Sequence, residues 1–221
     1  MFKAGAFALM AGLALSGSAA LAAGNAADGE RIAREGDGVG APCLACHGAD
    51  GAGTDEAGFP RLAGLDARYI VKQIRDYKSG ARFNELMQAN LSSLNEQQIL
   101  DVAAYYAAMP VPVMQSKQVA AELMALGEKL ATQGDWSRHL APCESCHGPG
   151  NAGVDENFPG IAGQHATYIG QQLRAWREGT RQNDPLQLMA AVAERMTDAE
   201  IDAAAAYMAA QPGKATQGGT K

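Results

Sequence analysis

The sequence predicts an all-α protein made of two similar domains in tandem, and three observations support this class. Apolar residues recur at the three- and four-residue spacing of amphipathic helices. A pattern about a hundred residues long occurs twice, which is too long for a solenoid unit and fits two small domains of one kind. Each copy contains the same type of five-residue motif, CLACH at residues 43–47 and CESCH at residues 143–147.

Residues 1–22 are expected to be a secretory signal peptide rather than part of the fold. Lys3 gives a short positive start, residues 4–15 are apolar, and a small-x-small cleavage pattern ends at Ala22. The apolar run is short for a membrane span, so an uncleaved membrane anchor is the less favoured alternative. No later segment is apolar enough to cross a membrane. The mature protein is therefore expected to be soluble and periplasmic.

The first domain is expected over residues 23–110. Asp28 is expected to cap a short helix that leads toward the first motif. After a glycine-rich loop, residues 66–79 keep a helical apolar stripe and predict a second helix. Residues 81–93 are expected to form a loop or a short helix. Residues 95–109 predict the last helix of the domain.

The same order of elements repeats in the second half. Residues 111–118 form a linker that is stiffened by prolines, and the second domain is expected over residues 119–212. Helices are predicted over residues 119–133 and 197–211. The tail, residues 213–221, is expected to be disordered. Further matched pairs are Phe59-Pro60 with Phe158-Pro159, Ala63-Gly64 with Ala162-Gly163, Tyr69 with Tyr168, Arg82 with Arg181, and Asn84 with Asn183.

The repeated motif Cys-x-x-Cys-His is the attachment signature of a c-type haem. If the motif is the last turn of a helix, its two thiols lie on one face and can each form a thioether with a vinyl group of one porphyrin. The adjacent histidine then binds the iron. The chain is therefore expected to carry two covalently attached haem c groups, held by Cys43, Cys46, His47, Cys143, Cys146 and His147.

Disulfides and a shared zinc site are the alternative uses of these cysteines. All four cysteines lie in the two motifs. Two disulfides in an exported chain would not explain the histidine that follows each pair. A tetrahedral zinc site would not explain the repeated sequence downstream of each motif.

Each iron needs a second axial ligand, and methionine is the favoured candidate. Met87 and Met189 occupy corresponding positions of the two repeats, and a thioether ligand raises the reduction potential by favouring ferrous iron. The alternative is that each methionine fills a gap in the core. His139 and His165 have no equivalents in the first half and are expected to be solvated or hydrogen-bonded rather than ligands.

These features together resemble the dihaem cytochrome c4 family, in which two class I cytochrome c domains stand in tandem. The resemblance rests on C-x-x-C-H-G, the Phe-Pro-x-x-Ala-Gly turn, the tyrosine-containing helix, Gly-x-Arg-x-Asn, the methionine and the last helix. It covers nearly all of residues 41–109 and 141–210. It implies two domains related by a pseudo-twofold axis, each wrapped around one covalent haem.

The resemblance also implies the axial ligand pairs, His47 with Met87 and His147 with Met189. The sequence departs from a strict repeat in two places. The first half lacks the Asp-Pro insertion that precedes Met189, and it has Leu65-Asp66 where the second half has Gln164-His165. Four polar residues are candidates to bind haem propionates, with helix-end surface positions as the alternative: Arg82, Asn84, Arg181 and Asn183.

The function implied by the resemblance is one-electron transfer in a respiratory chain, with no catalytic residue and no small-molecule substrate. Electrons would pass from an upstream donor protein to a terminal oxidase or reductase. One alternative is a dihaem electron-accepting subunit of an enzyme complex, such as one with a flavoprotein in sulfide oxidation. Another is a peroxidase-like enzyme, which the paired methionines disfavour.

Net charge bears on the partners. The formal charge of −6 disfavours nucleic-acid binding and suits docking to a basic surface on a partner protein. Peripheral association with the membrane is left open.

Overall fold

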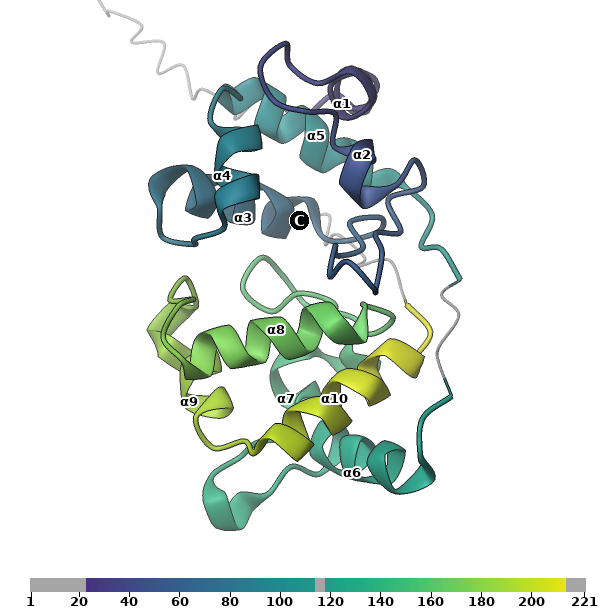
Figure 1. Ribbon diagram of the computed structural model, residues 1–221, viewed down its shortest axis with the longest axis vertical. Coiled ribbons are helices and arrows are strands. Elements are labelled where there is room, and N and C mark those ends of the chain that lie inside the picture. Colours follow the sequence, from purple (N-terminus) through teal and green to yellow (C-terminus); the bar gives the residue numbers. More distant parts are fainter. Residues whose placement is uncertain (1–22, 114–117, 214–221) are drawn as a thin grey trace, which may run out of the picture.

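The computed structural model describes residues 23–113 and 118–213 (Figure 1). The predicted signal peptide, the centre of the predicted linker and nearly all of the predicted tail lie outside these residues. Within the described ranges the chain is helical, with isolated β-bridges and no strand, which confirms the predicted all-α class. The helices gather in two units, with the first half of the chain above the second in Figure 1.

The helices of the first unit are α1 (Ala26–Glu35), α2 (Leu44–His47), α3 (Ala67–Ser79), α4 (Glu85–Leu91) and α5 (Glu96–Ala108). α1 and α3 both pack against α5, and α4 contacts α3. Their inner faces form one apolar core, in which Ile32, Ile99 and Tyr106 are almost completely buried. The predicted stripe on α3 is part of this core, since Ile70, Ile74 and Tyr77 are buried in it.

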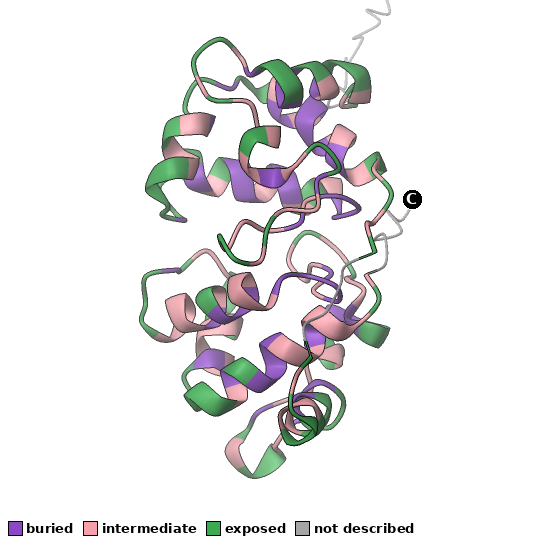
Figure 2. Cartoon of the chain, turned by 45° about the vertical axis from the view of Figure 1, so that its right-hand side comes forward, coloured by how far each residue is buried: buried purple, intermediate pink, exposed green. Residues whose placement is uncertain are grey.

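The second unit repeats this plan with added 3₁₀ turns. Its elements are α6 (Ala121–Thr132), η1 (Trp136–Arg138), α7 (Glu144–His147), η2 (Pro149–Asn151), α8 (Ala166–Arg177), η3 (Pro185–Gln187), α9 (Leu188–Ala193) and α10 (Asp198–Ala210). α10 packs on α6 and α8, and α9 packs on α8. Figure 2 shows that buried residues face the interior of each unit while exposed residues cover the outer helix faces.

The terminal helices of each unit approach each other closely because each pair crosses at a glycine. A Cβ on Gly29 of α1 would lie 2.0 Å from the carbonyl oxygen of Asp101 in α5. A Cβ on Gly127 of α6 would lie 2.2 Å from the carbonyl oxygen of Ala203 in α10. Any larger residue would have to push the two helices apart, so these glycines fix the spacing of the crossing.

The last helix of each unit begins with a capping box. Asn95 and Thr197 each form a capping box with the residue three positions later. The prediction that Asp28 caps the first helix is wrong. Asn25 is the N-cap, and its side-chain oxygen accepts from the amide of Ala27 at 3.0 Å. Asp28 lies in the first turn instead, where a carboxylate is also favourable.

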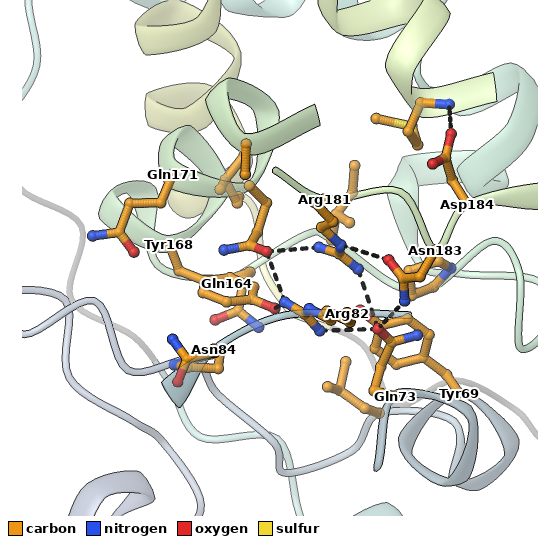
Figure 3. Close-up of a pocket in the computed structure, with 18 of the residues that line it drawn as sticks. Tyr69, Gln73, Arg82, Asn84, Gln164, Tyr168, Gln171, Arg181, Asn183 and Asp184 are labelled. Atoms are coloured by element: carbon orange, nitrogen blue, oxygen red, sulfur yellow. Dashed lines mark hydrogen bonds between the residues drawn. The ribbon is translucent and has the colours of Figure 1, made fainter. Parts of the chain in front are cut away.

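The two units meet in reciprocal contacts that follow the repeat. Arg82 and Arg181 face each other in an antiparallel β-bridge. The guanidinium of Arg82 donates to Gln172 of the other unit at 2.7 Å, and that of Arg181 donates to Gln73 at 3.2 Å (Figure 3). Gln73 and Gln172 are equivalent positions of the repeat, as are Arg82 and Arg181. Such a reciprocal pair of contacts is what a twofold relation between the units produces. This pattern supports the expected pseudo-twofold arrangement.

Candidate functional site

A cavity of about 960 Å³ extends through both units and brings the two motifs together. Its volume lies at the upper end of ordinary small-molecule sites, and its wall is mostly apolar, as suits a large flat aromatic group. All eight sequence-predicted site residues lie in this wall: Cys43, Cys46, His47, Met87, Cys143, Cys146, His147 and Met189.

The two motif histidines are buried and held by one type of hydrogen bond. His47 Nδ1 lies 2.9 Å from the carbonyl oxygen of Pro60, and His147 Nδ1 lies 2.7 Å from that of Pro159. A carbonyl oxygen can only accept, so Nδ1 carries the proton and Nε2 keeps a free lone pair. Because burial lowers the pKa of both rings, the imidazoles are neutral at neutral pH. Each site thus presents the form of histidine that binds iron.

The motif cysteines lie on one-turn helices of their own. Neither motif is the last turn of a longer helix, since α1 ends at Glu35, well before α2 begins at Leu44. The two thiols of the first motif still lie on one face, because Cys43 and Cys46 are separated by one helical turn. No cysteine of the described residues forms a disulfide, and burial raises the pKa of Cys143 to about 11. The four sulfurs belong to the cavity wall, where each pair can form the two thioether bonds that a haem requires.

The glycine loop after each motif is shaped by the carbonyl that holds the histidine. Gly53 has φ +74° and donates its amide to the carbonyl oxygen of His47 at 2.9 Å. A Cβ at Gly53 would lie 2.5 Å from the carbonyl oxygen of Pro60. The chain therefore approaches the Pro60 peptide as closely as only glycine allows. Gly153 likewise donates its amide to the carbonyl oxygen of His147, at 2.8 Å, and a Cβ there would lie 2.4 Å from the amide nitrogen of Gly160, which follows Pro159.

The two candidate methionine ligands lie on short helices of the same wall. Met87 is in α4 and Met189 is in α9, and both are partly buried against the apolar cores. α4 and α2 stand on the left and right of the upper unit in Figure 1, and both contribute residues to the cavity wall. Ligation by either methionine remains a prediction.

Different residues cap the two methionine helices. The amide of Met87 donates to Asn84 Oδ1 at 3.0 Å. The amide of Met189 instead donates to Asp184 Oδ2 at 2.9 Å. The longer segment of the second unit forms the turn η3, in which Leu186 is 91% exposed. The inserted residues therefore protrude into solvent, and Met189 still lies in the cavity wall. This explains the slip of register between the repeats.

The other two histidines have no equivalents in the first unit. His139 ends the turn η1 in the left-handed region and is exposed, and it lines the cavity. His165 Nε2 lies 2.8 Å from the carbonyl oxygen of Ala52 in the other unit. Both outcomes agree with the expectation that these rings are solvated or hydrogen-bonded.

Two arginines of the cavity wall are buried between the units, so a surface position for them is ruled out. Arg82 and Arg181 are only 5% and 6% exposed. Their hydrogen-bond acceptors within the described residues are neutral groups, among them Gln73, Gln172 and Tyr168 (Figure 3). Two buried cations with neutral partners suit an anionic group in the cavity, such as a carboxylate of the cofactor.

An indole beside Arg181 supports this interpretation. The guanidinium of Arg181 lies 4.0 Å from the ring centroid of Trp176, and the indole Nε1 is buried with no acceptor among the described residues. Both residues line the cavity, so together they offer donors to an anion placed there. The other two propionate candidates have different contacts: Asn84 is an exposed cap, whereas Asn183 binds Gln73 and Asp76 across the interface.

Sequence reasoning missed the residues that act through the backbone. The carbonyls of Pro60 and Pro159 orient the histidines, and the repeated Phe-Pro dipeptide was the available signal. The interface roles of Gln164 and His165 also went unrecognised, although their departure from the repeat was visible.

Comparison with known proteins gives a consistent result. The family model described as Cytochrome c matches residues 26–109 and 125–211. The chain is 46% identical to the "Thiosulfate dehydrogenase electron acceptor" of Stutzerimonas stutzeri (strain A1501), over 83% of this chain and 86% of that protein.

Two solved structures share the architecture. The reduced recombinant cytochrome c4 from Pseudomonas stutzeri matches with TM-score 0.76 and 33% identity, over 86% of this chain and all of that one. The thiosulfate dehydrogenase TsdBA from Marichromatium purpuratum matches with TM-score 0.79 and 38% identity, over 84% of this chain. The present chain spans 40% of the length of that TsdBA chain.

Proposed function

Because this chain belongs to the cytochrome c family, within the dihaem cytochrome c4 group, we propose that it carries electrons in the periplasm from a thiosulfate dehydrogenase to a terminal oxidase. The chain is an electron carrier with two covalently bound haem c groups and not itself an enzyme. The observation that carries the proposal is the paired, buried histidines, each with Nδ1 on a proline carbonyl and Nε2 free.

Four residues are proposed as the axial ligands, in the pairs His47 with Met87 and His147 with Met189. When bound, each haem supplies an iron that takes up and releases one electron. The residues of the chain orient the imidazoles and exclude water with an apolar wall. They also place hydrogen-bond donors near the interface of the two units. Because one cavity joins both sets of ligands, we propose that electrons pass between the two haems inside the protein.

The identity of the donor is proposed from the relatives. A protein called a thiosulfate dehydrogenase electron acceptor is 46% identical, and a TsdBA structure contains a region of this fold. These similarities favour the alternative function in general terms, namely an electron-accepting partner of an oxidoreductase. The oxidoreductase to test is then a thiosulfate dehydrogenase rather than a flavoprotein of sulfide oxidation.

The domain limits and the export route are also proposals. We propose domains over residues 23–110 and 119–212, joined by a linker over 111–118, after a signal peptide over 1–22. None of the helices within the described residues has the length and apolarity that a membrane crossing requires.

Haem content and methionine variants test the site assignment. The purified mature protein, made in a host that attaches haem, should carry two covalent haems, both low-spin in each oxidation state. Met87→Ala and Met189→Ala should each remove the Met–iron signature from one haem. Met109→Ala is the matched control, because Met109 packs on the core of the first unit and is not part of the cavity wall. A single haem, or a high-spin iron in the wild type, would contradict the carrier proposal.

The donor is tested by mixing experiments. A thiosulfate dehydrogenase supplied with thiosulfate should reduce both haems rapidly. The rate should fall with rising salt if the acidic carrier docks on a basic patch. Slow reduction together with fast reduction by another dehydrogenase would contradict the proposed donor while leaving the dihaem carrier intact.

A further inference from the structure

Arg61 is a fully buried arginine that joins the two units behind the cavity wall. It is 0% exposed and is not one of the residues that line the cavity. Its guanidinium donates across the interface to the carbonyl oxygens of Ala162 and Gly163, each at 3.1 Å. It also donates to the carbonyl oxygen of Ala63 in its own unit. Ala63 and Ala162 are equivalent positions of the repeat, so the guanidinium bridges matched turns.

The backbone of Arg61 also forms hydrogen bonds with the other unit. Its amide donates to Gln164 Oε1 at 2.8 Å, and its carbonyl accepts from Gln164 Nε2 at 3.0 Å. Gln164 stands where the first repeat has Leu65, and Gly160 stands where the first repeat has Arg61. The two departures from the repeat belong to one contact: the first unit supplies Arg61 and the second supplies Gln164. A strict repeat would lack this contact.

No carboxylate of the described residues neutralises the charge of Arg61. Throughout residues 23–113 and 118–213 its acceptors are amide oxygens, and no ion pair forms with it. Burial lowers the pKa of the guanidinium to about 10, so it stays protonated at neutral pH. A protonated group in this position is a fixed positive charge in a medium of low dielectric, where its field is weakly screened.

This charge lies close to the groups that hold the first iron ligand. Arg61 directly follows Pro60, whose carbonyl oxygen accepts from His47 Nδ1. The turn that it binds in the other unit follows Pro159 by three residues, and Pro159 binds His147. Arg61 therefore adjoins the support of His47 in the chain and binds the turn that follows the support of His147.

We propose that Arg61 favours the reduced state of both haems through the buried positive charge that it holds at the interface of the two units. The inference rests on the proposed function. Reduction adds an electron to an iron, and a nearby buried cation stabilises that electron. The guanidinium binds carbonyl oxygens of both units, so the effect should be measurable at both haems.

Potentiometric titration of the haem-loaded protein, followed by visible spectra, tests the proposal. Arg61→Gln removes the charge and should lower both reduction potentials. Arg61→Lys keeps the charge and should retain potentials near those of the wild type. Arg34→Gln is the control, because Arg34 is half exposed and paired with Glu30, and its loss should leave both potentials unchanged.

Equal potentials in haem-loaded Arg61→Gln and the wild type would overturn the proposal, as would a drop in Arg61→Lys as large as that in Arg61→Gln. If Arg61→Gln does not accumulate, Arg61→Met takes its place as the uncharged variant: lowered potentials support the proposal, and potentials equal to those of the wild type overturn it. Haem content and low-spin spectra are recorded for every variant. Abnormal spectra in the wild type would count against the ligand assignment, whereas normal spectra with unchanged potentials would count only against the role of Arg61.

Discussion

The caps of the two methionine helices should control how firmly the proposed ligands, Met87 and Met189, hold the irons. Asp184 Oδ2 accepts from the amides of Met189 and Ala190, at 2.9 and 3.1 Å, at the first turn of α9. Asp184→Ala removes the acceptor of both amides. Loss of a capping acceptor of this kind costs a helix about 1 kcal/mol of stability. Since 1.4 kcal/mol is a factor of ten in an equilibrium constant, the methionine-bound state should weaken about five-fold relative to the open state.

Competition by imidazole measures this change. An external ligand must displace the methionine, so the apparent affinity of the second haem for imidazole should rise about five-fold in Asp184→Ala. The first haem should be unaffected. Asn84→Ala should change the first haem instead of the second, because the side chain of Asn84 accepts from the amide of Met87. Asp184→Asn keeps an oxygen acceptor and should restore most of the wild-type behaviour.

Two results would refute this reasoning. One is an unchanged imidazole affinity of the second haem in a folded, fully loaded Asp184→Ala protein. The other is an equal change at both haems in either variant, because that would show a general loosening of the protein rather than a local effect on one helix.

Two further predictions follow from the histidine support and from the surface charges. Gly53→Ala places a Cβ against the Pro60 carbonyl and should displace it from His47, so the spectrum of the first haem should change while Gly153→Ala affects only the second. The hydrogen bond from Arg138 lowers the pKa of Glu200, so this carboxylate stabilises the fold above its ordinary pKa and loses that effect as the pH falls through the lowered value. Arg138→Gln should therefore be less stable than the wild type in urea at neutral pH, with the two curves converging in strong acid; parallel curves would contradict the assignment.

The repeat and the chemistry of attachment were predictable because both depend on local spacing. Two thiols three residues apart, followed at once by a histidine, specify their geometry within a single helical turn, whatever the rest of the chain does. The long helices were predictable for the same reason, since the apolar stripe of α3 and the capping boxes at Asn95 and Thr197 are contained within the helices that they define.

The interface could not be predicted from these local patterns. Arg82 and Arg181 end a helical region in a polar stretch, which usually indicates a surface, yet both are buried because each finds glutamine acceptors on the other unit. Asn84 and Asn183 match in the sequence but differ in contacts, because the insertion before Met189 transfers the capping role to Asp184.

The sequence by itself determined the helical class, the two copies, and the cysteines and histidines that we propose attach and bind the haems. The tertiary structure decided which nitrogen of each histidine is free, which residues cap the methionine helices and where Arg61 places its charge. The physical reason is distance along the chain. The acceptors for Arg61 come from residues about a hundred positions away, and no local spacing encodes a contact that exists only after both units have folded and met.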